Sequence, residues 1–499
     1  MLAVIAAPIL SAIVGMGLSF TQPNQVPLIP LMFFIMNGSL CFYYTILWLQ
    51  SKIDVFDPLG LLGAFGIVFY LAGPVMQIGS DYWPFIPSLR GQEDWFTIWA
   101  ALNSVGLAIF ALIVGRPTVR YRQLRSIWVI DFRYFKVIAL IALAITAASQ
   151  AYIFAKFGGV SGFIQTFSER QELHLGRTEN DPFENLGFIV VIAESFKYTF
   201  AMCCITYLKG KRYAKNIILF AALMSSLLAI FLVFGGLRGS RNATVFSLIF
   251  AVGMYSFWIK KVKVKLALAG VLFVFAFLTA YNWYKIAGVR GVGAIFDAQE
   301  RASFNNTRQD NSLFVFTRDM GRMDVQVLAM IGYEERGVPL RHGLTYAGAP
   351  FTVVPTAVVP WKPTHLAEAK SDVVFGVGQY NPKYRMTTIL FGLFGEAFIN
   401  FWYVGAVLSY AGLALVVRFT RRLVYGLAEN DARRLLVPVF CLLPINMLLA
   451  DAGVLVMMLT RALLIPTAVI MASVRVRRRL SARPGDEALT SRHALTPRI

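Results

Sequence analysis

Long apolar runs constrain this chain more than any other feature. Twelve predominantly apolar segments occur along it, most of them about 20 residues long, the length that a helix needs to cross a bilayer. Only 15% of the residues are charged, against about 25% in soluble domains. We therefore predict an all-α polytopic membrane protein with about 12 transmembrane helices, at residues 1–20, 27–50, 58–78, 95–115, 137–156, 187–208, 216–235, 242–259, 266–283, 398–417, 435–450 and 454–474.

The basic residues are concentrated in every second connection, for example KGKRYAK and KKVKVK. The segments on that side hold 27 of the 47 Lys and Arg residues but only 7 of the 27 Asp and Glu residues. By the positive-inside rule this side is cytoplasmic, and both termini lie on it. The net charge of +20 thus indicates topology and a surface for anionic lipid, and it is no evidence for nucleic-acid binding.

Four regions follow from this topology. Residues 1–283 contain helices one to nine, and 284–385 form a large outer loop, which its aromatic residues and helical periodicity predict to be folded. Residues 386–474 contain a re-entrant segment and helices ten to twelve. The polar residues 475–499 are expected to be a disordered cytoplasmic tail, and 157–186 a polar outer loop.

Arg238 and Arg241 lie in GLRGSR, on the predicted outer side between spans seven and eight. Guanidinium groups donate paired hydrogen bonds to phosphate oxygens, and neighbouring glycines let a ligand approach the backbone. We interpret the pair as a phosphate site. The alternative is that both are cations that end two helices and extend to the headgroups.

The segment FVFTRDMGRMDVQVLAM (314–330) predicts an amphipathic helix on the outer membrane surface. Arg318 and Arg322 lie one turn apart on its polar face, where they are candidates for a second phosphate site with Asp319 as a base. The alternative is a solvated face with internal ion pairs. The apolar stripe consists of Phe316, Met320, Met323 and Val327.

RHGLTYAGAPFTVVPTAVVPWKP (341–363) contains four prolines, which preclude a regular helix. His342, Tyr346 and Lys362 are candidates there to contact a sugar or a pyrophosphate, the alternative being an interfacial connector. Glu396, in FGLFGEAFINF, is a carboxylate at the outer end of a span. Because such a group is unfavourable in the membrane unless it is used or paired, Glu396 is a candidate base.

Four more charged residues lie in or beside spans six, eleven and twelve. Glu194 and Lys197 are three residues apart and are expected to pair, as are Asp451 and Arg461. No carboxylate cluster has the spacing of a metal site, so we expect neither a metal nor another cofactor.

In their order along the chain, GLRGSR, TRDMGRMD, HGLTYAGAPFTVVPTAVVPWKP and FGLFGEAFINFWYVGAV resemble segments of the bacterial oligosaccharide repeat-unit polymerases, the Wzy-type O-antigen and exopolysaccharide polymerases. The resemblance covers roughly residues 190–420. Trp402 stands where the family's pattern usually has a glycine, and Thr356 where it often has a basic residue. Four positions match a family pattern around Glu396: Gly395, Glu396, Asn400 and Gly405.

The resemblance implies a GT-C-like glycosyltransferase that joins undecaprenyl-diphosphate-linked repeat units at the periplasmic face. The growing chain would leave its lipid diphosphate and move to the non-reducing end of a new lipid-linked unit. The arginines would stabilise the leaving diphosphate. Glu396, Asp319 or His342 would accept the proton of the acceptor hydroxyl. A chain-length regulator protein is a candidate partner.

Three alternatives stay open. An O-antigen ligase also has a large outer loop with Arg and His. A flippase or other transporter of lipid-linked oligosaccharides is less consistent with this chain, which shows no two related halves. The third alternative is a polyprenyl-monophosphate-dependent GT-C enzyme. Such enzymes usually carry acidic residues in their first outer loop, and the corresponding loop here, TQPNQVP, has none, which argues against this alternative.

Overall fold

A computed structural model gives the architecture for residues 2–21, 24–83, 89, 91–118, 121–172, 186–235, 241–287, 293, 297, 299, 320–355, 358–381 and 389–478. The protein is mostly helical, as predicted, and each of the twelve predicted spans overlaps helical residues, although Phe401 and Trp402 interrupt the helix at the tenth, 398–417. Nine helices within the described residues are long and apolar enough to cross a membrane. Three apolar helices are shorter, namely Ile217–Val233, Thr244–Trp258 and Val437–Leu449.

The elements follow one another as helices with few interruptions. The first half comprises α1 (Leu2–Phe20), α2 (Leu28–Leu49), α3 (Pro58–Ile67), η1 (Val68–Ala72), α4 (Gly73–Ser80), α5 (Glu93–Val114), β1 (Ser126–Ile130), α6 (Phe132–Lys156), α7 (Gly159–Glu172), α8 (Gly187–Leu208), η2 (Arg212–Lys215) and α9 (Ile217–Val233). The second half comprises α10 (Arg241–Trp258), α11 (Val264–Ala287), α14 (Met323–Arg336), α15 (Leu344–Gly348), η5 (Ala349–Thr352), α16 (His365–Phe375), α17 (Gly392–Gly426), η6 (Ala432–Leu435), α18 (Val437–Leu449), α19 (Ala452–Ser473) and β2 (Val474–Arg478).

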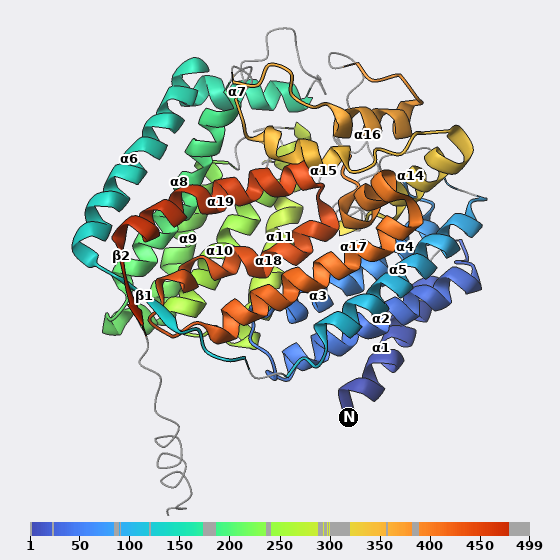
Figure 1. Ribbon diagram of the computed structural model, residues 1–499, viewed down its shortest axis with the longest axis horizontal. Helices are drawn as coiled ribbons and strands as arrows, with labels where there is room; N and C mark the ends of the chain where they lie inside the picture. The colour runs from blue at the N-terminus through green and yellow to red at the C-terminus, as the bar shows by residue number, and fades with distance from the viewer. Residues whose placement is uncertain are drawn as a thin grey trace, which may run out of the picture.

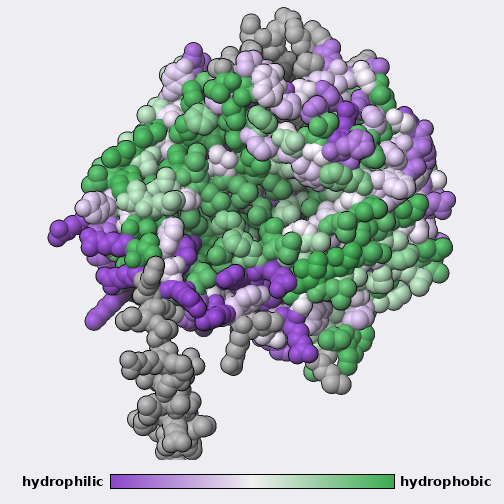
Figure 2. Space-filling view, in the orientation of Figure 1, coloured by the Kyte–Doolittle hydropathy of each residue, from purple (hydrophilic) through white to green (hydrophobic). Residues whose placement is uncertain are grey.

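The helices form one bundle with two distinct ends. Figure 1 shows α7, α14, α15 and α16 at one end, which we call the loop face, and β1 with β2 at the other, which we call the strand face. Helix α1 begins on the side of the strand face. Apolar side chains cover a broad band between the two faces, and hydrophilic residues gather along the strand face (Figure 2). This distribution is that of a multi-pass membrane protein.

Two regions that were predicted to lack regular structure contain a strand and a helix. The tail was expected to be disordered from residue 475, but Val474–Arg478 is a strand that pairs antiparallel with Ser126–Ile130. Valine and arginine alternate in VRVRR, which is the period of a strand with one apolar face. The predicted polar loop at 157–186 begins with a helix, Gly159–Glu172. Residues 479–499 lie outside the described residues.

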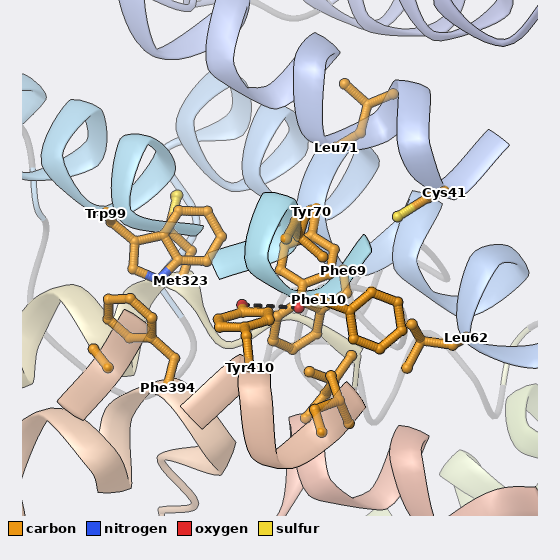
Figure 3. Packing of buried hydrophobic residues seen from close by; sticks show 14 of the residues in the cluster. Cys41, Leu62, Phe69, Tyr70, Leu71, Trp99, Phe110, Met323, Phe394 and Tyr410 are labelled. Atoms are coloured by element: carbon orange, nitrogen blue, oxygen red, sulfur yellow. Dashed lines mark hydrogen bonds between the residues drawn. The ribbon is translucent and has the colours of Figure 1, made fainter. Parts of the chain in front are cut away.

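The predicted surface helix at 314–330 differs from the structure over its described part. Gly321 and Arg322 are not helical, α14 begins at Met323, and Met323–Gly332 is buried on all sides. Residues 314–319 lie outside the described residues. Figure 3 shows Met323 among the aromatic side chains of Trp99 on α5 and Phe394 on α17. Met323 and Val327 of the apolar stripe therefore pack against protein on the loop face, and not against lipid headgroups.

The main core joins the N-terminal helices to α17. The hydroxyl groups of Tyr70 and Tyr410 lie 2.9 Å apart in its centre (Figure 3). A Cβ atom at Gly106 of α5 would lie 2.3 Å from the Tyr410 ring, so only glycine allows the two helices to pack this closely. This packing holds α17 in place, and the candidate site is at the start of α17.

Candidate functional site

A break in α17 creates the first feature of the site. Phe401 and Trp402 have non-helical backbone angles, which separate a short first section, Gly392–Asn400, from the rest of the helix. At this break the carbonyl groups of Ile399 and Asn400 accept hydrogen bonds from outside α17, from the backbone N–H groups of Arg341 (2.8 Å) and His342 (3.1 Å). The break thus binds the proline-containing segment to the end of this short helical section.

Side chains complete the same contact. Thr345 Oγ1 donates to Glu396 Oε1 (2.8 Å), and Asn400 Nδ2 donates to Thr345 Oγ1 (2.7 Å). The N–H of Gly343 donates to Asn400 Oδ1 (2.9 Å), and that of Ala452 donates to Glu396 Oε2 (2.6 Å). Glu396 and Thr345 are buried. Two motifs that lie about 50 residues apart in sequence therefore form one hydrogen-bonded unit, to which α19 also contributes.

His342 and Tyr346 lie at the edge of this unit. His342 is exposed and has a φ of 46°, and Gly343 follows with a φ of 86°. The two left-handed residues turn the chain sharply at this point. The Tyr346 ring stacks on Phe401 at 6.2 Å. Burial, and then the carboxylate of Glu396, raise the pKa of Tyr346, so its phenol stays protonated.

Ion pairs fix the surrounding helices. Lys370 Nζ of α16 lies 2.6 Å from Asp451 Oδ2. Asp451 Oδ1 accepts hydrogen bonds from the N–H groups of Phe391 (2.9 Å) and Gly392 (3.1 Å) at the start of α17. The expected pairing of Asp451 with Arg461 is therefore wrong. The prediction paired the N-cap residue of α19 with a residue near the middle of the same helix, whereas the actual partner, Lys370, lies on α16.

The predicted phosphate contacts are only partly described. Arg322 is buried, where Nε donates to the Leu449 carbonyl (3.2 Å) and Nη1 to that of Gly321 (2.6 Å), so it is not on an exposed polar face. Lys362 is half-buried in the proline-containing segment. Arg241 is the first residue of α10, but its side chain lies outside the described part. Three candidates lie entirely outside the described residues: Arg238, Arg318 and Asp319.

Charged residues also meet between α8 and α19. Glu194 Oε2 lies 2.9 Å from Arg461 Nη1, so the expected pairing of Glu194 with Lys197 is wrong. Lys197 is fully buried, and its Nζ has no hydrogen-bond partner among the described residues. Spacing along one helix could not reveal this arrangement, because Arg461 belongs to a helix that is distant in sequence. The one available signal was an arginine within the apolar run of α19.

No family model matches the chain, and no curated protein or solved structure matches it either. A functional conclusion therefore depends on the resemblance of its motifs and on the contacts that the described residues make.

Proposed function

We propose that the protein is a polymerase that joins undecaprenyl-diphosphate-linked oligosaccharide repeat units. One observation carries the proposal. The segment beginning at His342 and the segment around Glu396, two of the motifs that resemble the polymerase family, are hydrogen-bonded to each other through Thr345 and Asn400. A shared site gives these separate motifs a common purpose.

The break in α17 supports the same proposal. Trp402 has φ 59° and ψ −157°, a conformation that is essentially restricted to glycine. It also stands where the family's pattern usually has a glycine. The backbone of this chain thus retains the shape that the family's sequence pattern favours, although the side chain differs.

The geometry changes which of the three candidate bases we favour as the proton acceptor. Both oxygens of Glu396 accept hydrogen bonds within the protein, so in this conformation they are occupied. His342 is exposed on the same unit and can reach an acceptor hydroxyl. We propose that His342 accepts the proton and that Glu396 positions its segment, with Asp319 as the remaining candidate. Arg238 and Arg241 would stabilise the charge on the departing diphosphate.

The loop face would be periplasmic in this account, and the strand face cytoplasmic. Arg475 and Arg477 of β2 belong to the basic side of the chain, and hydrophilic residues line that side in Figure 2. The fold would be GT-C-like, with both termini in the cytoplasm of a bacterium and the site at the outer level of the inner membrane. The lipid tails would lie between helices.

Deleting the gene in its host tests the function. Loss of a polymerase leaves single repeat units on the final carrier, whereas loss of a ligase leaves long polymer on the lipid diphosphate. Loss of a flippase leaves single units on the cytoplasmic side. We expect the first pattern, with full-length polymer restored by the wild-type gene. Either of the other patterns would contradict the proposal.

Two histidine variants test the site within that experiment. His342→Ala should restore no polymer, at a membrane level equal to that of the wild type. His365→Ala is the matched control, since His365 is also on the loop face but belongs to α16, where its Nδ1 lies 3.8 Å from Glu368 Oε2. It should restore full-length polymer. Normal polymer from His342→Ala would remove this histidine from the mechanism.

A further inference from the structure

Lys197 is a cation buried halfway along a membrane helix. It lies near the middle of α8, and Arg461 lies near the middle of α19. Both helices are apolar enough to cross a membrane. Lys197 is fully buried, and its Nζ has no hydrogen-bond partner among the described residues. A buried, unpaired ammonium group is strongly unfavourable unless an anion compensates it.

The described residues around Lys197 supply one carboxylate. It belongs to Glu194 and lies 2.9 Å from Arg461. Lys197 also interacts electrostatically with Arg461, so two basic side chains share this one carboxylate within the described part of the chain. Tyr198, the neighbouring residue of Lys197 on α8, contributes a neutral ring whose centroid lies 5.8 Å from Nζ. The missing negative charge is expected from a ligand.

Gly235 leaves room beside this ammonium group. A Cβ atom at Gly235 would lie 2.8 Å from Lys197 Nζ, which is closer than real Cβ atoms approach such a group. The five residues that follow Gly235 in sequence, GLRGS, contain no acidic side chain. The absence of a side chain at Gly235 and the unpaired Nζ mark the same position.

We propose that Lys197, with Arg461, binds a phosphate group carried by a lipid head. A phosphate is an anion that accepts several hydrogen bonds, and a lipid can enter between membrane helices from the bilayer. Glu194 holds the guanidinium group of Arg461 in place. Two lipids have the required chemistry, namely a polyprenyl diphosphate and an anionic phospholipid.

The polyprenyl diphosphate is the expected lipid, and this identification rests on the proposed function. Helix α19 connects the two sites, because the N–H of Ala452 donates to Glu396 and Arg461 follows nine residues later. At a rise of 1.5 Å per residue the separation along α19 is about 14 Å. A lipid whose phosphates lie beside Lys197 could therefore extend its sugars toward His342.

The test is lipid binding to the purified full-length protein, measured by native mass spectrometry. The probes are undecaprenyl diphosphate, phosphatidylglycerol and the zwitterionic phosphatidylethanolamine. Lys197→Met should weaken the binding of undecaprenyl diphosphate about ten- to a hundred-fold, the effect of losing one charge-assisted hydrogen bond. Lys156→Met is the control, because Lys156 is exposed at the end of α6. It should bind like the wild type.

Two further measurements separate binding from folding. Without added lipid, Lys197→Met should unfold at a higher temperature than the wild type, because an uncompensated buried charge is removed. A lower unfolding temperature would make Lys197 a structural residue and overturn the proposal. Gly235→Ala should leave the fold intact, since only the flexible end of Lys197 must move, yet weaken lipid binding in the same way as Lys197→Met.

The lipid probes also distinguish the two sources. If Lys197→Met weakens the binding of undecaprenyl diphosphate but not of phosphatidylglycerol, the site belongs to the substrate. If it weakens the binding of phosphatidylglycerol but not of undecaprenyl diphosphate, the site belongs to a membrane lipid. Equal affinities of wild type and variant for both anionic lipids would overturn the site. The polymerase proposal is tested separately, by the polysaccharide that accumulates after gene deletion.

Discussion

Trp402 offers a direct test of the break in α17. Its backbone conformation, with φ 59° and ψ −157°, is one in which any residue other than glycine is strained by about 1–3 kcal/mol. Trp402→Gly and Trp402→Ala both remove the side chain and its 3.1 Å hydrogen bond to Glu334. The lost contacts are therefore the same in both variants, and their difference reports the backbone. The Trp402→Gly variant should therefore have a free energy of unfolding that exceeds that of Trp402→Ala by up to this strain energy.

The assay is thermal unfolding of both variants in one detergent at one scan rate. For a chain of this length we expect a midpoint about 1–2 °C higher for Trp402→Gly per kcal/mol of relieved strain. Gly412→Ala is the control, because Gly412 lies in the same helix with open space around it. The Gly412→Ala variant should be more stable than the wild type by about 0.5–1 kcal/mol. Greater stability of Trp402→Ala than of Trp402→Gly would refute a break at this position.

Four other predictions concern the phosphate site, pH, topology and metal. Arg238→Lys and Arg241→Lys should each lose about ten- to a hundred-fold in polymerisation rate, since lysine lacks the planar fork. Full-length polymer at normal yield from both would leave them a role only at helix ends. Burial raises the pKa of Asp324 above its ordinary value of 3.8, so the unfolded state ionises first and stability falls as the pH rises through that interval. Asp324→Asn should therefore gain stability relative to the wild type from about pH 4 upward, whereas a constant difference would contradict the raised pKa. A cysteine at Asn306 should react with an impermeant reagent on intact cells, and reaction only after permeabilisation would reverse the topology. Polymerisation should continue in EDTA, and a requirement for Mg²⁺ or Mn²⁺ would show that expectation to be wrong.

The positions of the membrane helices could be predicted closely from the sequence. Span length and hydropathy depend on local composition, so the predicted run at 187–208 is the observed helix α8. The surface position predicted for the helix at 314–330 is wrong over Met323–Met330 for the opposite reason. Its apolar stripe indicates a buried face but not what covers it, and here Trp99 and Phe394 do so. The strand Val474–Arg478 was missed because its partner lies about 350 residues earlier.

The site was predictable in its parts but not in its contacts. His342, Tyr346 and Glu396 were selected one by one from their local motifs. The side-chain hydrogen bonds that join the two motifs pass through Thr345 and Asn400, two neutral residues with no distinctive signal of their own. The pairs that spacing suggested were wrong, because Glu194 pairs with Arg461 of α19 and Asp451 with Lys370 of α16, and both partners are distant in sequence.

The most direct test of the polymerase account uses purified protein in liposomes with a single undecaprenyl-diphosphate-linked repeat unit. The measurement is the mass of the lipid-linked products together with the amount of free undecaprenyl diphosphate. We predict products with two or more repeat units on one lipid, and one undecaprenyl diphosphate released for each new glycosidic bond. Unchanged single-unit lipid, in liposomes that contain folded protein, would contradict the account.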